Sequence, residues 1–170
     1  MGIFYEFQQI FMKTDKEKKY NYDKKTALQK AANWCAFQER SQQETRDKLY
    51  EWQMRPDEVE DIIATLIAEN FLNEERFAFA YVSGKFKIKK WGKLKIKQGL
   101  KLKRVPDLLI KKAMNSIDED EYLETLQTLL EKKQALEREK NVLKRQLKLL
   151  NYLQSKGYEK DLIFTLLKSS

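Results

Sequence analysis

Apolar and polar positions along the chain repeat one helical pattern three times. Each copy has apolar residues three and seven positions after a shared starting point, which is Pro56, Pro106 or Glu159. Proline suits the first turn of a helix, where its missing N–H leaves no hydrogen bond unmade. The apolar pairs are Val59 and Ile63, Leu109 and Ala113, and Leu162 and Leu166. The pattern predicts three helices whose starts lie 50 and 53 residues apart.

A second set of matched positions lies upstream of each predicted helix. The matched residues are Leu49, Leu100 and Leu153, and also Thr45, Ile96 and Leu149, with offsets of 51 and 53 residues. One small insertion or deletion reconciles these offsets with those of the helix starts. The alternative is a set of ordinary amphipathic helices of similar length. The repeat predicts an all-α protein of three tandem three-helix repeats that form an elongated, curved array.

The repeat divides the chain into four segments. Residues 1–23 are expected to be a loosely ordered N-terminal arm, because charged residues interrupt them. The three-helix repeats are then 24–68, 69–116 and 117–168. In the second repeat, Asn73 is a good N-cap, and Glu74 and Glu75 suit the positive end of the helix dipole.

Residues 85–104 read KFKIKKWGKLKIKQGLKLKR, and their alternation of lysine with apolar residues resembles a half-buried strand. The segment from Gly92, however, aligns with residues 41–53, which have no strand character. Read as a helix, it places Ile96 and Leu100 on one face and a row of lysines on another. We therefore predict a helix, separated from the preceding one by a break at Trp91-Gly92.

Residues 121–150 also contain leucines at every seventh position, from Leu129 to Leu150, which is the spacing of a coiled coil. Lys133 and Lys140 stand at the partner positions, where a coiled coil needs apolar residues. Two consecutive helices broken near residues 139–141 are therefore preferred over a dimerising coiled coil.

Composition supports an all-α fold and shows where the charge lies. The chain has only five Gly and two Pro among 170 residues, which is few for a fold rich in turns. Its formal net charge is +8, yet residues 85–112 alone carry +11, so the remainder is slightly acidic. Such a basic block indicates a polyanion or an acidic protein surface as the partner, and a solvated lysine face is the alternative.

Several functional classes are disfavoured by what the sequence lacks. It has no His, no phosphate-binding glycine loop and no cluster of metal ligands, so we expect no catalytic residue, no metal and no cofactor. The lone Cys35, among apolar neighbours, is expected to be a buried structural thiol. No run of 18 apolar residues exists, and the N-terminus fits a signal peptide poorly. The sequence predicts a cytoplasmic protein without membrane contact.

Four motifs resemble the RecX regulatory proteins of bacterial recombination. They lie between about Ala27 and Leu167, and their order and spacing match together. The motifs are ERSQQETRDKL (39–49), LIAENFLNEERFA (66–78), WGKLKIKQGL (91–100) and LQSKGY (153–158). The sequence departs from the family where Asn73, Glu74 and Glu75 stand in place of Asp residues. Asn70 and Arg104 occupy positions where glycine is common.

The resemblance implies a function that composition does not. RecX proteins have three tandem three-helix units, bind the filament that RecA forms on single-stranded DNA, and usually restrain its ATPase, strand-exchange and co-protease activities. The resemblance thus implies a non-enzymatic, monomeric negative modulator of RecA. Single-stranded DNA would be contacted through the filament, or directly and weakly. The alternative function is direct, sequence-independent DNA binding by a lysine-rich helix on phosphates.

The candidate contact residues come from the basic block and from the family motifs. The first choices for contact with RecA or DNA are Lys89, Lys93, Lys97, Lys101 and Arg104. The second choices are Arg40, Arg46 and Arg76, for which pairing inside the molecule with Glu44, Glu74 or Glu75 is at least as strong an alternative. Four aromatic residues near these positions are expected to fill the core rather than stack on bases: Trp52, Phe77, Tyr81 and Trp91.

Overall fold

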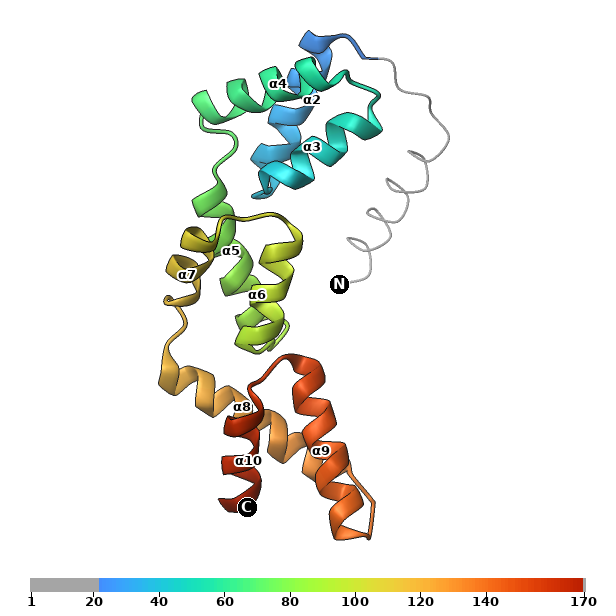
Figure 1. Cartoon of the computed structure of the whole chain (residues 1–170), viewed down its shortest axis with the longest axis vertical. Coiled ribbons are helices and arrows are strands. Elements are labelled where there is room, and N and C mark those ends of the chain that lie inside the picture. The colour runs from blue at the N-terminus through green and yellow to red at the C-terminus, as the bar shows by residue number, and fades with distance from the viewer. Residues whose placement is uncertain (1–21, 170) are drawn as a thin grey trace. The chain divides into compact units, whose positions relative to one another are not determined.

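The structure, a computed structural model, describes residues 22–169. Within this range the chain forms helices and no strand, and the helices α2 to α10 fall into three consecutive sets of three (Figure 1). The all-α class and the three-helix organisation are therefore confirmed. The predicted arm, residues 1–23, lies outside the described residues except for its last two positions. The elongated, curved arrangement of the repeats stays a prediction.

The described chain divides into two compact units. The first unit contains the described residues up to Gln38 together with Glu44–Phe71, and the second contains Glu39–Gln43 and the chain from Leu72 onward. The first repeat thus makes up nearly all of one unit, whereas the second and third repeats belong to the same unit.

The first repeat consists of α2 (Lys24–Phe37), α3 (Gln42–Glu51) and α4 (Pro56–Ala68). Its core is made by buried apolar side chains from all three helices. Cys35 is buried there, with its Sγ 3.9 Å from Thr45 Oγ1. The prediction that this thiol is buried is confirmed.

The second repeat consists of α5 (Glu74–Lys87), α6 (Lys93–Leu102) and α7 (Asp107–Met114). Asn73 caps α5 as predicted, because its side-chain oxygen accepts a hydrogen bond of 2.8 Å from Arg76 N. The lysine-rich segment is a helix rather than a strand, and Trp91-Gly92 lies in the break before it. Both of these predictions are confirmed.

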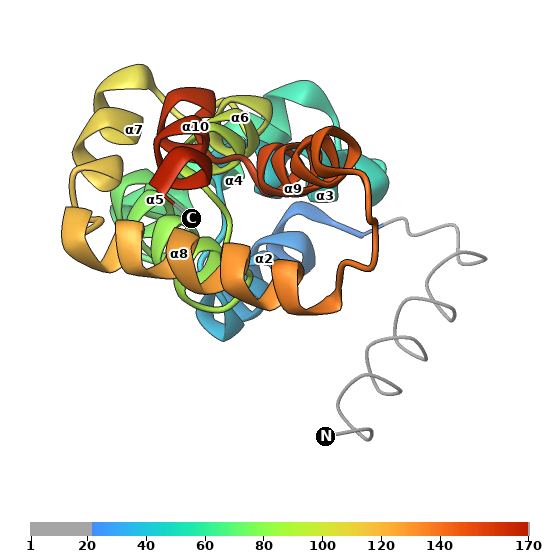
Figure 2. The same ribbon diagram turned by 90° about the horizontal axis from the view of Figure 1, so that it is seen from below.

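The third repeat consists of α8 (Glu119–Leu136), α9 (Val142–Lys156) and α10 (Lys160–Ser169). Figure 2 shows α8 and α9 as two separate helices joined by residues 137–141. This break interrupts the continuous helix that a coiled coil through Leu129, Leu136, Leu143 and Leu150 would need. The interpretation as two consecutive repeat helices is confirmed.

The second and third repeats share one apolar core. It runs without a break from Phe77 in α5 to Ile163 in α10. Aromatic rings connect the two parts of this core. The ring centroids of Phe86 and Tyr122 are 5.9 Å apart, and those of the stacked rings of Tyr122 and Tyr158 are 5.0 Å apart. Because these contacts are buried, the two repeats pack as one body.

The three second helices of the repeats end in the same way. Gln53, Arg104 and Gly157 each follow one of these helices with a positive φ, of 61°, 56° and 94°. The next residue then donates a backbone hydrogen bond to the leucine five positions earlier. These bonds join Met54 to Leu49 and Val105 to Leu100 at 3.2 Å, and Tyr158 to Leu153 at 3.3 Å. This is the Schellman arrangement, in which a buried apolar residue follows the left-handed one.

These ends correct the predicted register of the repeat. The left-handed residues lie 51 and 53 residues apart, the same offsets as the upstream leucines. The prolines, in contrast, are not equivalent, since Pro56 is the first residue of α4 and Pro106 is the N-cap of α7. The prediction was one residue off because proline is tolerated at both positions, neither of which needs its N–H. Consequently Ile110 and Ile163, rather than Leu109 and Leu162, are the buried counterparts of Val59.

The two residues that stand where glycine is common in the family lie at backbone positions that favour glycine. Asn70 and Arg104 both have positive φ, of 60° and 56°. Asparagine tolerates this region better than other non-glycine residues, whereas arginine adopts it at a modest energetic cost.

Candidate functional site

The basic block of the sequence lies on one repeat, over the end of α5, the whole of α6 and α7, and the connections between them. Lys89 is in the α5–α6 connection, Lys93 is the first residue of α6, and Lys97 and Lys101 follow one and two turns later. Arg104 is the left-handed residue after α6. The five first-choice residues are therefore on neighbouring segments, but their surroundings differ.

Two of the five are engaged inside the molecule. Lys93 pairs with Glu119 at the start of α8, and its ammonium lies 4.6 Å from the centroid of the Tyr122 ring. Lys101 lies 3.7 Å from the carboxylate of Asp107, and both side chains are more than half exposed. Pairing and partial burial make Lys93 a structural residue, whereas the loose, solvated pair of Lys101 contributes little to stability.

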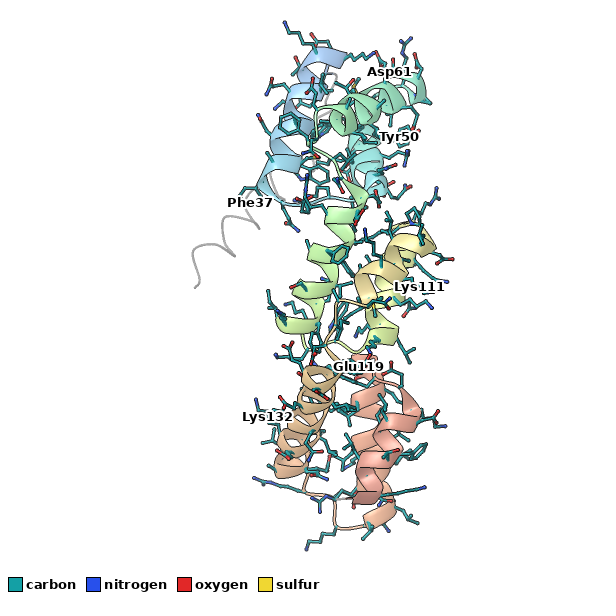
Figure 3. All side chains as sticks on the ribbon, turned by 90° about the vertical axis from the view of Figure 1, so that its left-hand side faces the viewer. Phe37, Tyr50, Asp61, Lys111, Glu119 and Lys132 are labelled. Atoms are coloured by element: carbon teal, nitrogen blue, oxygen red, sulfur yellow. The ribbon has the colours of Figure 1, made fainter. Side chains whose placement is uncertain are left out.

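The other three are exposed, and within residues 22–169 no acidic group pairs with them. These are Lys89, Lys97 and Arg104. Three further cations share this property and were missed by the sequence analysis, although the basic block contained them: Lys87, Lys90 and Lys111. Figure 3 shows Lys111 projecting away from α7 and Glu119 at the start of α8. We call these six residues the basic face.

Two of the three second-choice arginines form ion pairs within the molecule. Arg46 on α3 donates two hydrogen bonds to Glu60 on α4, of 2.7 and 3.0 Å, and this contact lowers the pKa of the Glu60 carboxyl. Arg76 pairs with Glu39, and Arg40 is partly buried. The alternative of pairing with glutamates holds for Arg46 and Arg76, although their partners are Glu60 and Glu39 rather than the glutamates considered from sequence.

The aromatic residues divide into core and surface-edge positions. Trp52 and Phe77 are buried, at 7% and 4% exposure, as expected of core residues. Trp91 is only partly buried, and the ammonium groups of Lys85 and Lys95 lie 4.9 and 4.8 Å from its ring centroid. These cation–π contacts hold two lysines of the block against the protein, so neither belongs to the basic face.

The N-terminus of α6 is fixed by the third repeat. Its first free N–H groups donate to the turn between α9 and α10: Gly92 N to Lys156 O at 2.8 Å, and Leu94 N to Gly157 O at 3.0 Å. Between them, Lys93 N donates to the Tyr122 hydroxyl at 2.9 Å. A helix begins with N–H groups that have no partner within it, and here the adjoining repeat accepts from them.

Two glycines make this contact possible. A Cβ on Gly92 would lie 2.3 Å from the carbonyl carbon of Gly157, and a Cβ on Gly157 would lie 2.2 Å from the Cβ of Lys95. Both distances are well below contact distance, and Gly157 also has a φ of 94°. The pair allows backbone to meet backbone, which sets the direction of α6.

Tyr122 also takes part in this contact between α6 and the third repeat. Its hydroxyl donates to Glu159 at 2.6 Å while accepting from Lys93 N. Burial, reinforced by the hydrogen bond to the Glu159 carboxylate, raises the pKa of Tyr122 well above its ordinary value. The hydroxyl therefore stays protonated, and it is buried with both a donor and an acceptor satisfied.

A shallow groove of about 350 Å³ runs between α6 and the end of α9. It is lined on one side by Leu94, Lys95 and Gln98, and on the other by Gln154, Ser155, Gly157, Tyr158 and Lys160. None of these residues is acidic. Lys95 donates to the carbonyl oxygen of Ser155 at 2.8 Å across the groove.

The described part of the chain offers no metal-binding cluster of three or more His, Cys, Asp or Glu residues. Within residues 22–169, no helix is both long and apolar enough to span a bilayer.

Comparison with protein families matches all three repeats, in order. The models for the first, second and third three-helix domains of RecX match residues 27–66, 73–114 and 119–167. The chain is 27% identical over 144 residues to regulatory protein RecX of Bacillus mycoides, and 26% identical to that of Bacillus cereus strain B4264. These matches cover 85% of this chain but 53% of each relative, so the chain spans about half the length of the relatives it matches.

Two solved structures share the fold. The crystal structure of RecX from Lactobacillus salivarius superposes with a TM-score of 0.74 at 25% identity, over 86% of this chain and 95% of that one. Another crystal structure of regulatory protein RecX gives a TM-score of 0.77 at 20% identity, over 86% and 72% of the two chains. With three consecutive RecX domains matched in order, the chain belongs to the RecX family of regulatory proteins.

Proposed function

We propose that the protein is a negative modulator of RecA, which binds the filament of RecA on single-stranded DNA and restrains its ATPase, strand-exchange and co-protease activities. Membership of a regulatory family supports this role. The observation that carries the proposal is the basic face, whose six cations are exposed and have no acidic partner within the described residues. A monomer without catalytic activity, acting in the cytoplasm, is sufficient for this function.

The charge of the basic face suits a negatively charged target. Charges that are satisfied within a protein contribute little to a partner, since their fields are already neutralised. Lys87, Lys89 and Lys90 form one group at the end of α5, and Lys97, Arg104 and Lys111 form another on α6 and α7. Such a surface steers association with acidic protein or with phosphates.

The test is the DNA-dependent ATP hydrolysis of RecA, titrated with the purified protein. We expect hydrolysis to fall at or below one molecule of protein per RecA. The triple variant K89E/K97E/K111E should lose this inhibition, because it reverses three exposed charges without touching an ion pair of the described chain. Arg104 is left unchanged because of its left-handed backbone.

The matched control reverses three exposed cations of the third repeat, in the variant K132E/K140E/K144E. It makes the same change in net charge, so it should inhibit as the wild-type protein does. Unchanged ATP hydrolysis with folded wild-type protein would overturn the proposed function. Equal loss in both triple variants would show that net charge, rather than the basic face, is responsible.

A second candidate function is direct, sequence-independent binding of single-stranded DNA, and the same six unpaired cations favour it. If all six contact phosphates, the logarithm of affinity falls with the logarithm of salt with a slope of about −4. Affinity for bare DNA that equals affinity for the RecA filament would support this function over the first.

A further inference from the structure

The outer face of α6 carries two leucines that are exposed to solvent, where polar side chains are usual. Leu94, Lys97, Gln98, Lys101 and Leu102 lie at successive helical positions, opposite the buried Ile96 and Leu100. Leu94 is 54% exposed and Leu102 is 77% exposed. The two leucines stand eight residues apart, about 12 Å along the helix, with the two lysines between them.

In the first repeat, an ion pair joins two helices at the corresponding positions. With the offset of 51 residues, Lys97 is equivalent to Arg46, and Lys111 is equivalent to Glu60. Arg46 and Glu60 join α3 to α4 by two hydrogen bonds. In the second repeat a lysine stands at each of these positions, so two cations replace the ion pair, and no acidic group of the described residues pairs with either of them.

The groove beside Leu94 extends this face. Its lining adds Lys95 and Lys160 and the amides of Gln98 and Gln154, with no carboxylate. A surface of this kind has cations for acidic groups and leucines for apolar ones. Phosphates would use only the cations, because a DNA backbone offers nothing that buries a leucine.

From these observations we infer that the outer face of α6, with Lys111 of α7 and the adjoining groove, binds an acidic protein segment that bears apolar side chains. The inference rests on the proposed function, in which the filament presents this segment. Carboxylates of the segment take the place that Glu60 holds in the first repeat, between Lys97 and Lys111. Its apolar side chains cover Leu94 and Leu102.

The experiment measures binding of the full chain to preformed RecA filaments and, separately, to bare single-stranded DNA. The variant L94Q/L102Q removes the leucines without changing charge. We expect it to weaken filament binding about tenfold, which corresponds to about 1.4 kcal/mol, and to change bare-DNA affinity by less than about twofold. The variant L136Q/L143Q, which alters leucines that are 77% and 76% exposed on the third repeat, should bind as the wild type does.

Each other outcome points to a different occupant or to none. Equal weakening of filament and bare-DNA binding by L94Q/L102Q would assign the face to nucleic acid and overturn the inference. A wild-type dimer in sedimentation that L94Q/L102Q converts to a monomer would assign it to a second copy of this chain. Wild-type protein that binds no filament overturns the proposed function itself, whereas unimpaired filament binding by L94Q/L102Q overturns this inference alone. Unchanged helicity and thermal midpoint show that the variant is folded.

Discussion

Helices α3 and α6 occupy the same place in two successive repeats, yet they differ in almost every solvent-facing side chain. Both have ten residues, and both end in the same left-handed turn, at Gln53 and Arg104. Each buries one residue near its start and an equivalent leucine, Leu49 or Leu100, near its end. The formal charge of α3 is −1 and that of α6 is +4.

The contrast separates what the repeat needs from what the second repeat adds. Because α3 folds with a mixed, internally paired surface, the two lysines of α6 that make no buried contact, Lys97 and Lys101, are not required to build a repeat. The exchange of Glu60 for Lys111 also removes the anion that the fold would otherwise supply. Lys97, Arg104 and Lys111 therefore remain available to a partner outside the chain, as the proposed function requires.

The largest expected effect comes from the residue that precedes each helix, which is Ser41 before α3 and Gly92 before α6. In Gly92→Ser, the new Cβ would lie 2.3 to 2.4 Å from backbone atoms of Gly157 and Tyr158. The clash is with backbone, which cannot move aside as a side chain can, so we expect a loss of about 3 kcal/mol in the free energy of unfolding. Urea unfolding followed by circular dichroism measures it.

Gly84 provides the control for this substitution. A Cβ at Gly84 would meet nothing within 4 Å, so Gly84→Ala should be neutral or should stabilise α5 by up to about 1 kcal/mol. Equal stability of G92S and wild type would show that the second and third repeats are not joined through the N-terminus of α6.

A smaller effect is expected from Tyr122→Phe. The Tyr122 hydroxyl, which belongs to α8, accepts a hydrogen bond from the first residue of α6. The change leaves Lys93 N and Glu159 without the partners that the hydroxyl supplies, which costs about 2 kcal/mol. Since the folded protein holds the hydroxyl proton more tightly than the unfolded chain does, the stabilisation is complete below the ordinary tyrosine pKa of 10.0. It is lost as the pH rises above that value, by up to about 1.4 kcal/mol per pH unit.

Unfolding in urea at pH 9 and pH 11 tests the prediction. The wild type should lose more stability than Y122F between these two pH values. Tyr158, whose pKa burial also raises, remains in both proteins and accounts for the alkaline loss that Y122F retains. An identical loss in the two proteins would contradict the role given to Tyr122.

The next effect concerns the turn that α3 and α6 share. Arg104→Gly relieves a φ of 56° on a residue with a Cβ, so the free energy of unfolding should rise by about 0.5 to 1 kcal/mol. The same variant removes a cation of the basic face and should weaken binding to the filament. Thermal unfolding and filament binding measure the two effects, and a destabilised R104G would contradict the reading of this turn.

The smallest effect on stability comes from restoring the ion pair of the first repeat. In Lys111→Glu, the new carboxylate can pair with Lys97 as Glu60 pairs with Arg46, which should stabilise the second repeat by about 0.5 kcal/mol. Binding to the filament should weaken nonetheless, because the anion that the partner supplies is now internal. Stronger binding by K111E, or none of the gain in stability, would show that the two repeats are not equivalent at this contact.

Much of this architecture is visible in the sequence because it depends on short-range rules. The N-cap at Asn73 follows from local chemistry, whereas the helix α6 and the break at Gly92 follow from the alignment of this segment with residues 41–53, and the structure has each of them. The register of α7 was misplaced by one residue because proline is equally acceptable at two positions.

The candidate site was less predictable because it depends on long-range pairing. Lys93 faces Glu119 across 26 residues, and Arg46 faces Glu60 across 14, and neither contact follows from helical spacing. Which lysines remain unpaired is therefore set by the packing of helices. The replacement of the Arg46–Glu60 pair by Lys97 and Lys111 was readable from the repeat once its offset of 51 residues was correct.

The most direct test of the central claim asks what lies against the outer face of α6 in the filament. Lys97→Cys would carry a photoreactive benzophenone, with Lys132→Cys as the control on the third repeat, while the native Cys35 is buried and does not react. On illumination with RecA filaments, position 97 should give a covalent adduct with RecA protein, and position 132 should give little. Adducts of position 97 with DNA alone, or equal adducts from both positions, would contradict the account.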